Sequence, residues 1–293
     1  MNLAQKTSQA NRLNSSLDLY AGYSDVDSGT VGGLFAVTGS GTIFGGRWNY
    51  YLPRWGDVEH KVYLGLDYRA YKNNVTLAGI GFVPDITTHP VSLGYGGLLR
   101  MAASEWSFNG SVSANVPGGN DGKSEDFERS RTGAPADYTI LRYGTSFSHA
   151  YRSEWQSRIA FSGQYTQNSL VSGEQFGIGG PDTVRGYLPR EASNDTGYAT
   201  QVELYTPNFA AKIGMGDKWR TRMVGFYDFG AVSRNNPLPG ELHGKYLAST
   251  GLGLRLTYGK SVSLRMDLAH VLKDHGTRQA GDQRLNASVV IIY

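Results

Sequence analysis

The sequence of 293 residues contains no cysteine and no long hydrophobic run. Without cysteine the chain can form no disulfide and no thiolate metal site, an absence that fits an envelope protein. No apolar stretch approaches the roughly 18 residues that a membrane-spanning helix needs, and the mean hydropathy is only −0.37. A transmembrane β-barrel would pass this test unnoticed, because each of its strands turns half of its residues to the lumen.

A strong excess of charge and the usual marks of an enzyme are lacking as well. The net charge is +3, and no basic cluster is interleaved with aromatic residues, so we expect no nucleic-acid partner. The sequence contains no HExxH motif, no Walker loop and no metal-ligand cluster. Its six histidines are not spaced to pair with a serine and an acid. We therefore expect a protein that is not an enzyme and that binds no cofactor and no metal.

What the sequence does contain is alternation of apolar and polar residues, while helical periodicity is almost absent. In WSFNGSVSANV, Trp106, Phe108 and Val112 share one face while serine and asparagine share the other. Such segments, about ten residues long, match tilted membrane-spanning strands better than the five or six residues usual in soluble sheets. We count about twelve of them, at residues 15–24, 40–52, 59–71, 89–99, 104–116, 137–149, 155–168, 197–207, 218–231, 245–258, 261–271 and 283–293.

The connections between these segments are of two kinds that alternate along the chain. The short connections lie at 53–59, 100–105, 150–154 and 258–261. The long polar connections lie at 24–39, 72–88, 117–136, 169–196 and 272–282. Bacterial outer-membrane barrels alternate short periplasmic turns with long extracellular loops in this way, and they carry aromatic girdles near the strand ends. We therefore predict an all-β fold, a transmembrane antiparallel β-barrel, rather than a soluble sandwich.

Charged residues of the expected strands lie on the face opposite the apolar stripe. On the lipid side each would cost about 2–4 kcal/mol near the midplane, so we place them in a wet lumen. There we expect most of them to be hydrated and to pair with one another: Arg47, Asp67, Arg69, Arg142, Arg158, Glu203, Arg220, Arg222, Asp228, Arg255, Arg265, Asp267 and Arg284.

One long connection, which contains GIGGPDTVRGYLPRE at residues 177–191, is unlike a simple surface loop. Its glycines and proline favour tight, unusual backbone angles. A loop of glycine and apolar residues tipped by Arg185 suits a fold back into the lumen, where a guanidinium can form a bidentate pair with a wall carboxylate. Alternation in GFYDFGAV turns Phe226, Asp228 and Gly230 to the lumen, so Asp228 is the candidate partner.

At these residues the sequence resembles a known family. VRGY (Val184, Arg185, Gly186 and Tyr187) and FYDFG (226–230) are similar to the two signature motifs of the two-partner secretion transporters of the TpsB type. These are the haemolysin and filamentous-haemagglutinin secretion/activation proteins. The phrases YAGYSDVDSGTV, GSGTI, LGLDY, SGEQFGIGGPDTVRGY and VELYTP also look like that family, so the resemblance covers nearly the whole chain.

The resemblance implies a sixteen-stranded barrel whose sixth extracellular loop enters the lumen and pairs Arg185 with Asp228. It also implies a site in the outer membrane of a Gram-negative bacterium. There such a pore exports one large partner exoprotein of the TpsA type, a haemolysin or an adhesin, unfolded and without ATP. Periplasmic POTRA domains of the family capture that partner.

The N-terminal side departs from this family pattern. The polar start MNLAQKTSQANRLN contains no apolar core of a signal peptide. Seven expected strands precede the VRGY loop, where the family has eleven. We therefore expect residues 1–293 to be a single barrel domain without signal peptide, POTRA domains and first four strands, resembling the last twelve strands of the sixteen. Missing strands would leave edges that lipid cannot satisfy, although twelve strands can in principle close.

The end of the chain carries a further pattern. RLNASVVIIY places apolar residues at every second position before a terminal aromatic residue. Val289, Ile291 and Tyr293 look like the signal by which the outer-membrane assembly machinery recognises barrels. The barrel-assembly machinery, outer-membrane lipid and lipopolysaccharide are therefore expected partners besides the exoprotein.

Two alternatives to secretion stay open. A passive porin needs only the barrel and its arginine-rich lumen, but it leaves the VRGY loop without a role. A membrane-protein insertase belongs to another branch of the same superfamily, although the local phrases favour secretion.

Overall fold

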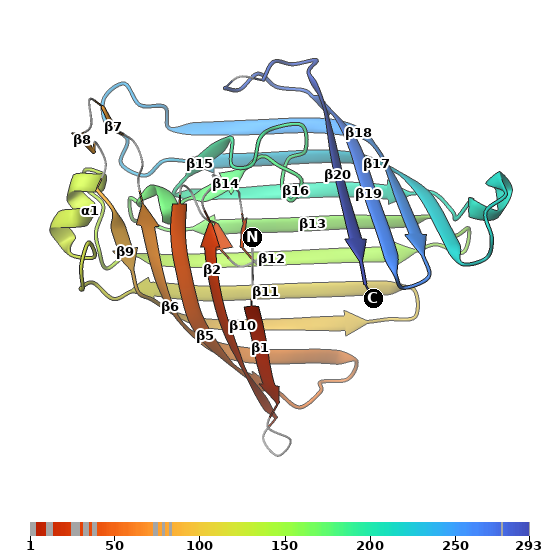
Figure 1. The fold of residues 1–293 in the computed structure, drawn as a ribbon, viewed down its shortest axis with the longest axis horizontal. Helices are drawn as coiled ribbons and strands as arrows, with labels where there is room; N and C mark the ends of the chain where they lie inside the picture. The colour runs from red at the N-terminus through yellow and green to blue at the C-terminus, as the bar shows by residue number, and fades with distance from the viewer. Residues whose placement is uncertain are drawn as a thin grey trace.

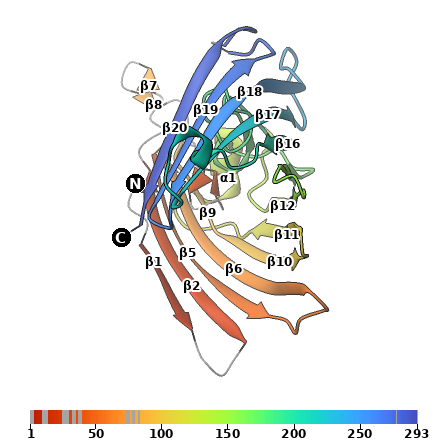
Figure 2. The same ribbon diagram turned by 90° about the vertical axis from the view of Figure 1, so that its right-hand side faces the viewer.

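A single antiparallel sheet dominates the computed structural model, which describes residues 4–9, 14–24, 30–31, 35–36, 40–72, 76–77, 80–81, 84–276 and 278–292. The strand order follows the sequence: β1-β2-β5-β6-β10-β11-β12-β13-β16-β17-β18-β19-β20. The sheet curls strongly, so that one of its faces is concave (Figures 1 and 2). Sequential antiparallel neighbours of this kind are the topology of an up-and-down β-barrel.

All twelve expected strands are present in this sheet. They are β2 (Ser15–Ser24), β5 (Ser40–Tyr51), β6 (Val58–Lys72), β10 (Pro90–Arg100), β11 (Ser104–Asn115), β12 (Thr139–Ala150), β13 (Gln156–Tyr165), β16 (Thr196–Tyr205), β17 (Trp219–Ser233), β18 (Gly244–Tyr258), β19 (Val262–Val271) and β20 (Gln283–Ile291). A further strand, β1 (Ala4–Gln9), pairs with β2, and β9 (Ile86–Thr88) pairs with β6 beside the main path. Eight strands of the path, rather than seven, therefore precede the VRGY loop.

Within the described residues no pairing joins β1 to β20. The described sheet is therefore an open one, with these two strands as its edges. Its concave side is the space that we call the lumen.

Because apolar and polar residues alternate along each strand, they lie on opposite faces of the sheet. On β17, Tyr227 is 46% exposed on the outer face, whereas Asp228 is fully buried on the inner one. Exposed apolar side chains recur on the outer face of other strands, among them Leu66, Leu93 and Leu252. An outward apolar band opposite a polar interior is the arrangement of a transmembrane barrel.

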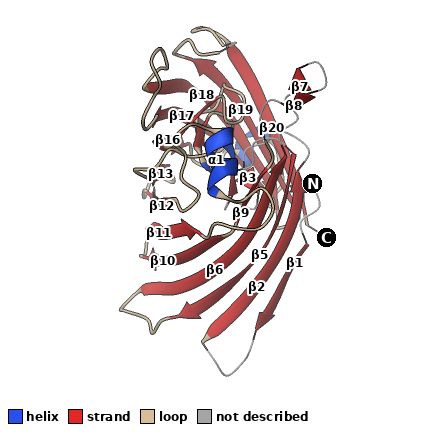
Figure 3. Ribbon diagram, turned by 90° about the vertical axis from the view of Figure 1, so that its left-hand side faces the viewer, coloured by secondary structure: helices blue, strands red, loops and turns tan. Residues whose placement is uncertain are grey.

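Most short turns and most long loops lie at opposite ends of the strands, but the connection 206–218, which contains η2 (Ala210–Ile213), is a long one at the short-turn end (Figure 1). The long-loop end carries α1 (Ser124–Ser130), which lies within the curve of the sheet when seen from that end (Figure 3). None of the helices in the described ranges is long and apolar enough to cross a membrane. The small elements outside the sheet are β3 (Thr30–Val31), β4 (Phe35–Ala36), β7 (Thr76–Leu77), β8 (Ile80–Gly81), η1 (Ser172–Glu174), β14 (Phe176–Ile178), β15 (Ala192–Asn194) and η2 (Ala210–Ile213).

Buried apolar residues form two clusters where loops meet the inner face. The first joins the α1 loop and the start of the 166–195 loop to the wall through Tyr71, Ile86, Phe127, Ala134, Ala136, Tyr138, Ile140, Leu170 and Val171. The second joins the rest of that loop to later strands through Ile178, Val184, Tyr187, Ala192, Ala199, Val232, Leu247 and Val271. Loops are therefore packed as firmly as a core against the inside of the wall.

Candidate functional site

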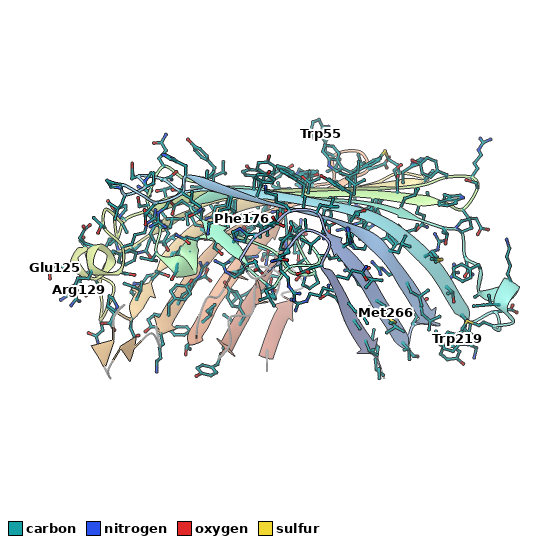
Figure 4. All side chains as sticks on the ribbon, turned by 90° about the horizontal axis from the view of Figure 1, so that it is seen from above. Trp55, Glu125, Arg129, Phe176, Trp219 and Met266 are labelled. Carbon is teal, nitrogen blue, oxygen red and sulfur yellow. The ribbon has the colours of Figure 1, made fainter. Side chains whose placement is uncertain are left out.

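The connection between β13 and β16, residues 166–195, folds into the lumen as expected. Within it β14 and β15 pair as a small antiparallel hairpin. Phe176 of this hairpin lies on the concave side of the sheet, seen from above in Figure 4. We call residues 166–195 the lumen loop.

Arg185 lies at the inner end of the lumen loop and is fully buried. Its Nε atom is 2.7 Å from Oδ2 of Asp228 and its Nη2 atom is 2.7 Å from Oδ1, which makes a bidentate pair. The backbone N–H of Arg185 also donates to Asp228, at 3.0 Å. Charge-assisted bidentate bonds of this kind are among the strongest and most directional in proteins.

Asp228 is one of three carboxylates that meet Arg185. Nη1 of Arg185 is 2.8 Å from Oε1 of Glu203 and 3.7 Å from Oδ1 of Asp267. The ring of Phe226 faces the guanidinium, with 3.6 Å between the guanidinium carbon and the ring centroid, which is a cation–π contact. Strands β16, β17 and β19 thus build an acidic pocket that accepts one arginine.

Neighbouring wall arginines share the carboxylates of this pocket. Arg158 is 3.0 Å from Glu203, while Arg255 and Arg265 are 2.8 and 2.7 Å from Asp267. Pairing of this kind is what charges buried against a wall require, because an unpaired buried charge is very costly. The expected pairing of lumen charges is therefore observed for these residues.

The residues beside Arg185 hold the tip of the lumen loop in place. Gly186 has φ +96°, a backbone angle that side chains disfavour. The buried hydroxyl of Tyr187 donates to the backbone carbonyls of Ala248, at 3.1 Å, and Lys273, at 2.6 Å. Val184 is fully buried in the second apolar cluster. The VRGY residues therefore hold the loop tip to several strands of the wall at once.

The FYDFG segment provides the surface on which this tip rests. Phe226, Asp228 and Gly230 all lie on the inner face. A Cβ atom at Gly230 would lie 3.0 Å from Ile178 and 3.1 Å from Val184. The glycine therefore gives the loop room to approach the wall.

The residues proposed as an assembly signal lie apart from this site. Val289 and Ile291, on β20, are 59% and 66% exposed on the outer face. Tyr293 lies outside the described residues.

Glu174, in η1 of the lumen loop, forms a second buried ionic site that sequence reasoning missed. Its carboxylate accepts hydrogen bonds from Arg69 at 2.9 Å, Tyr71 at 2.9 Å, Thr88 at 3.2 Å and Arg142 at 3.1 Å. Burial acts to raise the pKa of Glu174, but Arg69 and Arg142 outweigh it and bring the pKa to about 2. The side chain is therefore an anion held between two arginines.

A third ionic contact ties the lumen loop to the α1 loop. The buried carboxylate of Asp195 pairs with Arg131 through both oxygens, and Arg131 also donates to the carbonyl of Leu170 at 2.7 Å. The Asp195 oxygens accept from the backbone N–H groups of Leu170 and Asn235 as well. The lumen loop and the α1 loop thus form one body across the inside of the sheet.

Comparison with known proteins adds a family to this geometry. The family model described as haemolysin secretion/activation protein ShlB/FhaC/HecB matches residues 14–256. A curated relative, the heme/hemopexin transporter protein HuxB of Haemophilus influenzae, is 26% identical over 157 residues. That match covers 52% of this chain and 26% of the relative.

Solved structures of outer-membrane barrels share the fold. CdiB from Acinetobacter baumannii has a TM-score of 0.65 at 18% identity, covering 94% of this chain and 47% of that one. CdiB from Escherichia coli has a TM-score of 0.63 at 18% identity, with 94% and 48% covered. BamA from Haemophilus ducreyi lacking POTRA domains 1–3 has a TM-score of 0.58 at 16% identity, with 94% and 59% covered. The chain thus spans about half the length of the CdiB chains.

Proposed function

The chain belongs to the haemolysin secretion/activation protein family, and on that premise we propose that it forms the wall of an outer-membrane pore that secretes a partner exoprotein. The family is one of transporters rather than enzymes, and its barrels lie in the outer membrane of Gram-negative bacteria. The route of the exoprotein is the lumen of the barrel. No step of this transport is catalytic in the chemical sense.

The observation that carries the proposal is the lumen loop held against the inner wall by Arg185. A passive porin has no need of a buried arginine in a pocket of Asp228, Glu203 and Asp267. A transporter must let a polypeptide pass and then close again. A lumen loop that can move, and that returns to a position set by ion pairs, would serve this purpose. On this proposal the lumen loop of the structure is in its resting position, and the loop moves from it while the exoprotein passes.

Further partners belong to the same proposal. The exposed apolar outer face meets membrane lipid and lipopolysaccharide. The alternating residues that include Val289 and Ile291 are read by the barrel-assembly machinery during insertion. These residues are exposed on an edge strand, where such reading is sterically open.

A charge exchange tests the proposal. We expect Arg185→Glu to impair secretion of the partner exoprotein strongly, because it places a fourth carboxylate beside Asp228, Glu203 and Asp267. Adding Asp228→Arg restores the ionic pair in reverse and should recover part of the secretion. Recovery is partial because Glu203 and Asp267 were also paired with the original arginine. The measurement is the amount of exoprotein in the medium against the amount of barrel in the outer membrane.

Arg152→Glu is the matched control, since it reverses an exposed arginine in the turn between β12 and β13. It should secrete as the parent does. Normal secretion by Arg185→Glu would refute the role given to the pair. Steady, wide conductance in planar bilayers that does not change with substitutions at 181–190 would instead favour a passive porin.

A further inference from the structure

The lumen loop has a first limb, which contains Glu174, and a second limb, which contains Arg185, and the two limbs contact different parts of the wall. From β13 the first limb leads to Glu174, whose partners Arg69 and Tyr71 are on β6. In the sheet order β6 is separated from β13 by β12, β11 and β10. The second limb carries Arg185, whose carboxylate partners lie on β16, β17 and β19. The loop therefore reaches the wall in opposite directions from the strands that it joins.

The side chain of Glu174 is as completely enclosed as that of Arg185. Both are buried to 0% side-chain exposure, and Arg69 beside Glu174 is 4% exposed. Gly173 allows this approach, since a Cβ atom there would lie 2.7 Å from the ring of Tyr71. The backbone carbonyl of Glu174 also accepts from Gln164, at 2.9 Å. A segment of only three helical residues is thus fixed by charge, by packing and by a backbone hydrogen bond.

The two ionic sites share no residue. The Glu174 site draws on β6, β9 and β12, and the Arg185 site on β16, β17 and β19. The charges are also opposite: the first limb offers an anion to wall arginines and the second a cation to wall carboxylates. Loss of one site therefore removes no partner from the ion pairs of the other.

We propose that Glu174 is a positioning residue that anchors the first limb of the lumen loop independently of Arg185. Displacement of the whole loop then requires the release of two oppositely charged anchors on two parts of the wall. The β14–β15 pairing links the two limbs to each other, so loss of one anchor frees its own end of the loop while the other anchor stays in place. The biological role of this anchor rests on the proposed secretion function, but the experiment below does not depend on secretion.

A thiol-labelling experiment tests it, because the 293-residue sequence contains no cysteine. The first-limb reporter is the substitution Val171→Cys, at a position 2% exposed, and the second-limb reporter is Val184→Cys, at a fully buried position. Each is introduced into the intact protein in outer membranes, and its rate of reaction with a water-soluble maleimide is measured. The protein without the reporters gives the background.

We expect Glu174→Gln to raise the labelling rate of the first-limb reporter at least about tenfold, since breaking a buried ion pair is strongly destabilising. The rate of the second-limb reporter should stay within about twofold of the parent. Arg185→Gln should give the converse, with the second-limb reporter accelerated and the first-limb reporter unchanged. Glu125→Gln, which neutralises an exposed carboxylate on α1, is the matched control and should change neither rate.

Heat-modifiable migration in gels verifies that each variant is a folded barrel. Should Glu174→Gln fail to fold, Arg142→Gln provides a second variant, because it removes one donor from the carboxylate at a position 28% exposed. It should accelerate labelling of the first-limb reporter by a smaller factor.

Two outcomes would overturn the proposal. One is a parental labelling rate of the first-limb reporter in every variant that folds, whether Glu174→Gln, Arg142→Gln or both. The other is equal acceleration of both reporters by Glu174→Gln. Secretion is measured separately, so loss of limb-specific labelling and loss of transport are distinguishable failures.

Discussion

Gly230 shows, at the scale of single residues, how little space the site has. It lies on the inner face of β17, two positions from Asp228, and a Cβ atom built on it would lie 3.0 Å from Ile178 and 3.1 Å from Val184 of the lumen loop. Interiors are close-packed, so an added side chain here must displace the loop or the wall. The residue at position 230 therefore affects how closely the tip of the lumen loop can pack against the wall.

We predict that Gly230→Val lowers the free energy of unfolding by about 1–3 kcal/mol, the usual cost of overpacking. It should also expose the loop tip, measured as faster labelling of the second-limb reporter. Gly225→Val is the matched control on the same strand, because a Cβ atom there meets only Leu252, at 4.0 Å. Equal effects of the two substitutions would show that the strand, rather than the loop seat, is disturbed.

The sequence predicted some residues of the site and missed others for a physical reason. Alternation along one strand is enough to turn Asp228 inward, and the family resemblance pairs it with Arg185. The convergence of Glu203 and Asp267 on the same guanidinium depends on the register between strands, which alternation along a single strand does not contain. Glu174 was missed for another reason: it lies in η1 of the lumen loop, where no alternation indicates which way a side chain turns, although its phrase SGEQF was among those that resembled the family.

Arg131 links two loops at the scale of elements. It joins the α1 loop to Asp195 at the base of the lumen loop, and it donates to the carbonyl of Asn235 in the next connection at 3.0 Å. Three connections of the long-loop end thus depend on one guanidinium. Because it is only 10% exposed, its loss leaves the Asp195 carboxylate buried without its cation.

We predict that Arg131→Ala loosens the α1 loop without unfolding the sheet, because the strands keep their own hydrogen bonds. Limited proteolysis of intact cells should cleave within residues 117–138 several-fold faster than in the parent. Arg129→Ala is the control, since that arginine is 66% exposed and its pair with Asp126 lies within α1. Exposed pairs of this kind contribute little. A cleavage rate in Arg131→Ala equal to that of the parent would show that Arg131 does not hold the α1 loop in place.

Elements with regular alternation were predicted, and elements without it were not. The twelve expected strands alternate clearly, whereas β1 has the sequence AQKTSQ, which is polar after its first residue and gives no period-two signal. η1 and the β14–β15 hairpin are three-residue elements inside a glycine-rich loop. Tertiary contacts with the wall fix such short pieces, so a local pattern cannot reveal them.

At the scale of the whole molecule, the two faces of the sheet meet different solvents. The outer face exposes apolar side chains, whereas the inner face holds the ion pairs and the lumen loop. In water the outer face would be an extensive apolar patch, of a size that soluble monomers do not tolerate. Lipid around the outer face and water or protein within the curve explain both faces together.

We test this division with one strand that carries both faces. On β11, Val112 is 50% exposed on the outer face, and Asn109 is an exposed residue of the inner face. Val112→Arg, near the long-loop end of β11, should lower the free energy of unfolding from lipid vesicles in urea by about 1–3 kcal/mol, because the cost of an arginine on the lipid face falls from about 2–4 kcal/mol at the midplane toward the interfaces. Asn109→Arg adds the same charge to the wet interior and should cost less than about 1 kcal/mol, because the guanidinium keeps its water there. Equal losses for the two variants would mean that both faces meet the same solvent, and the chain would then not be a membrane barrel.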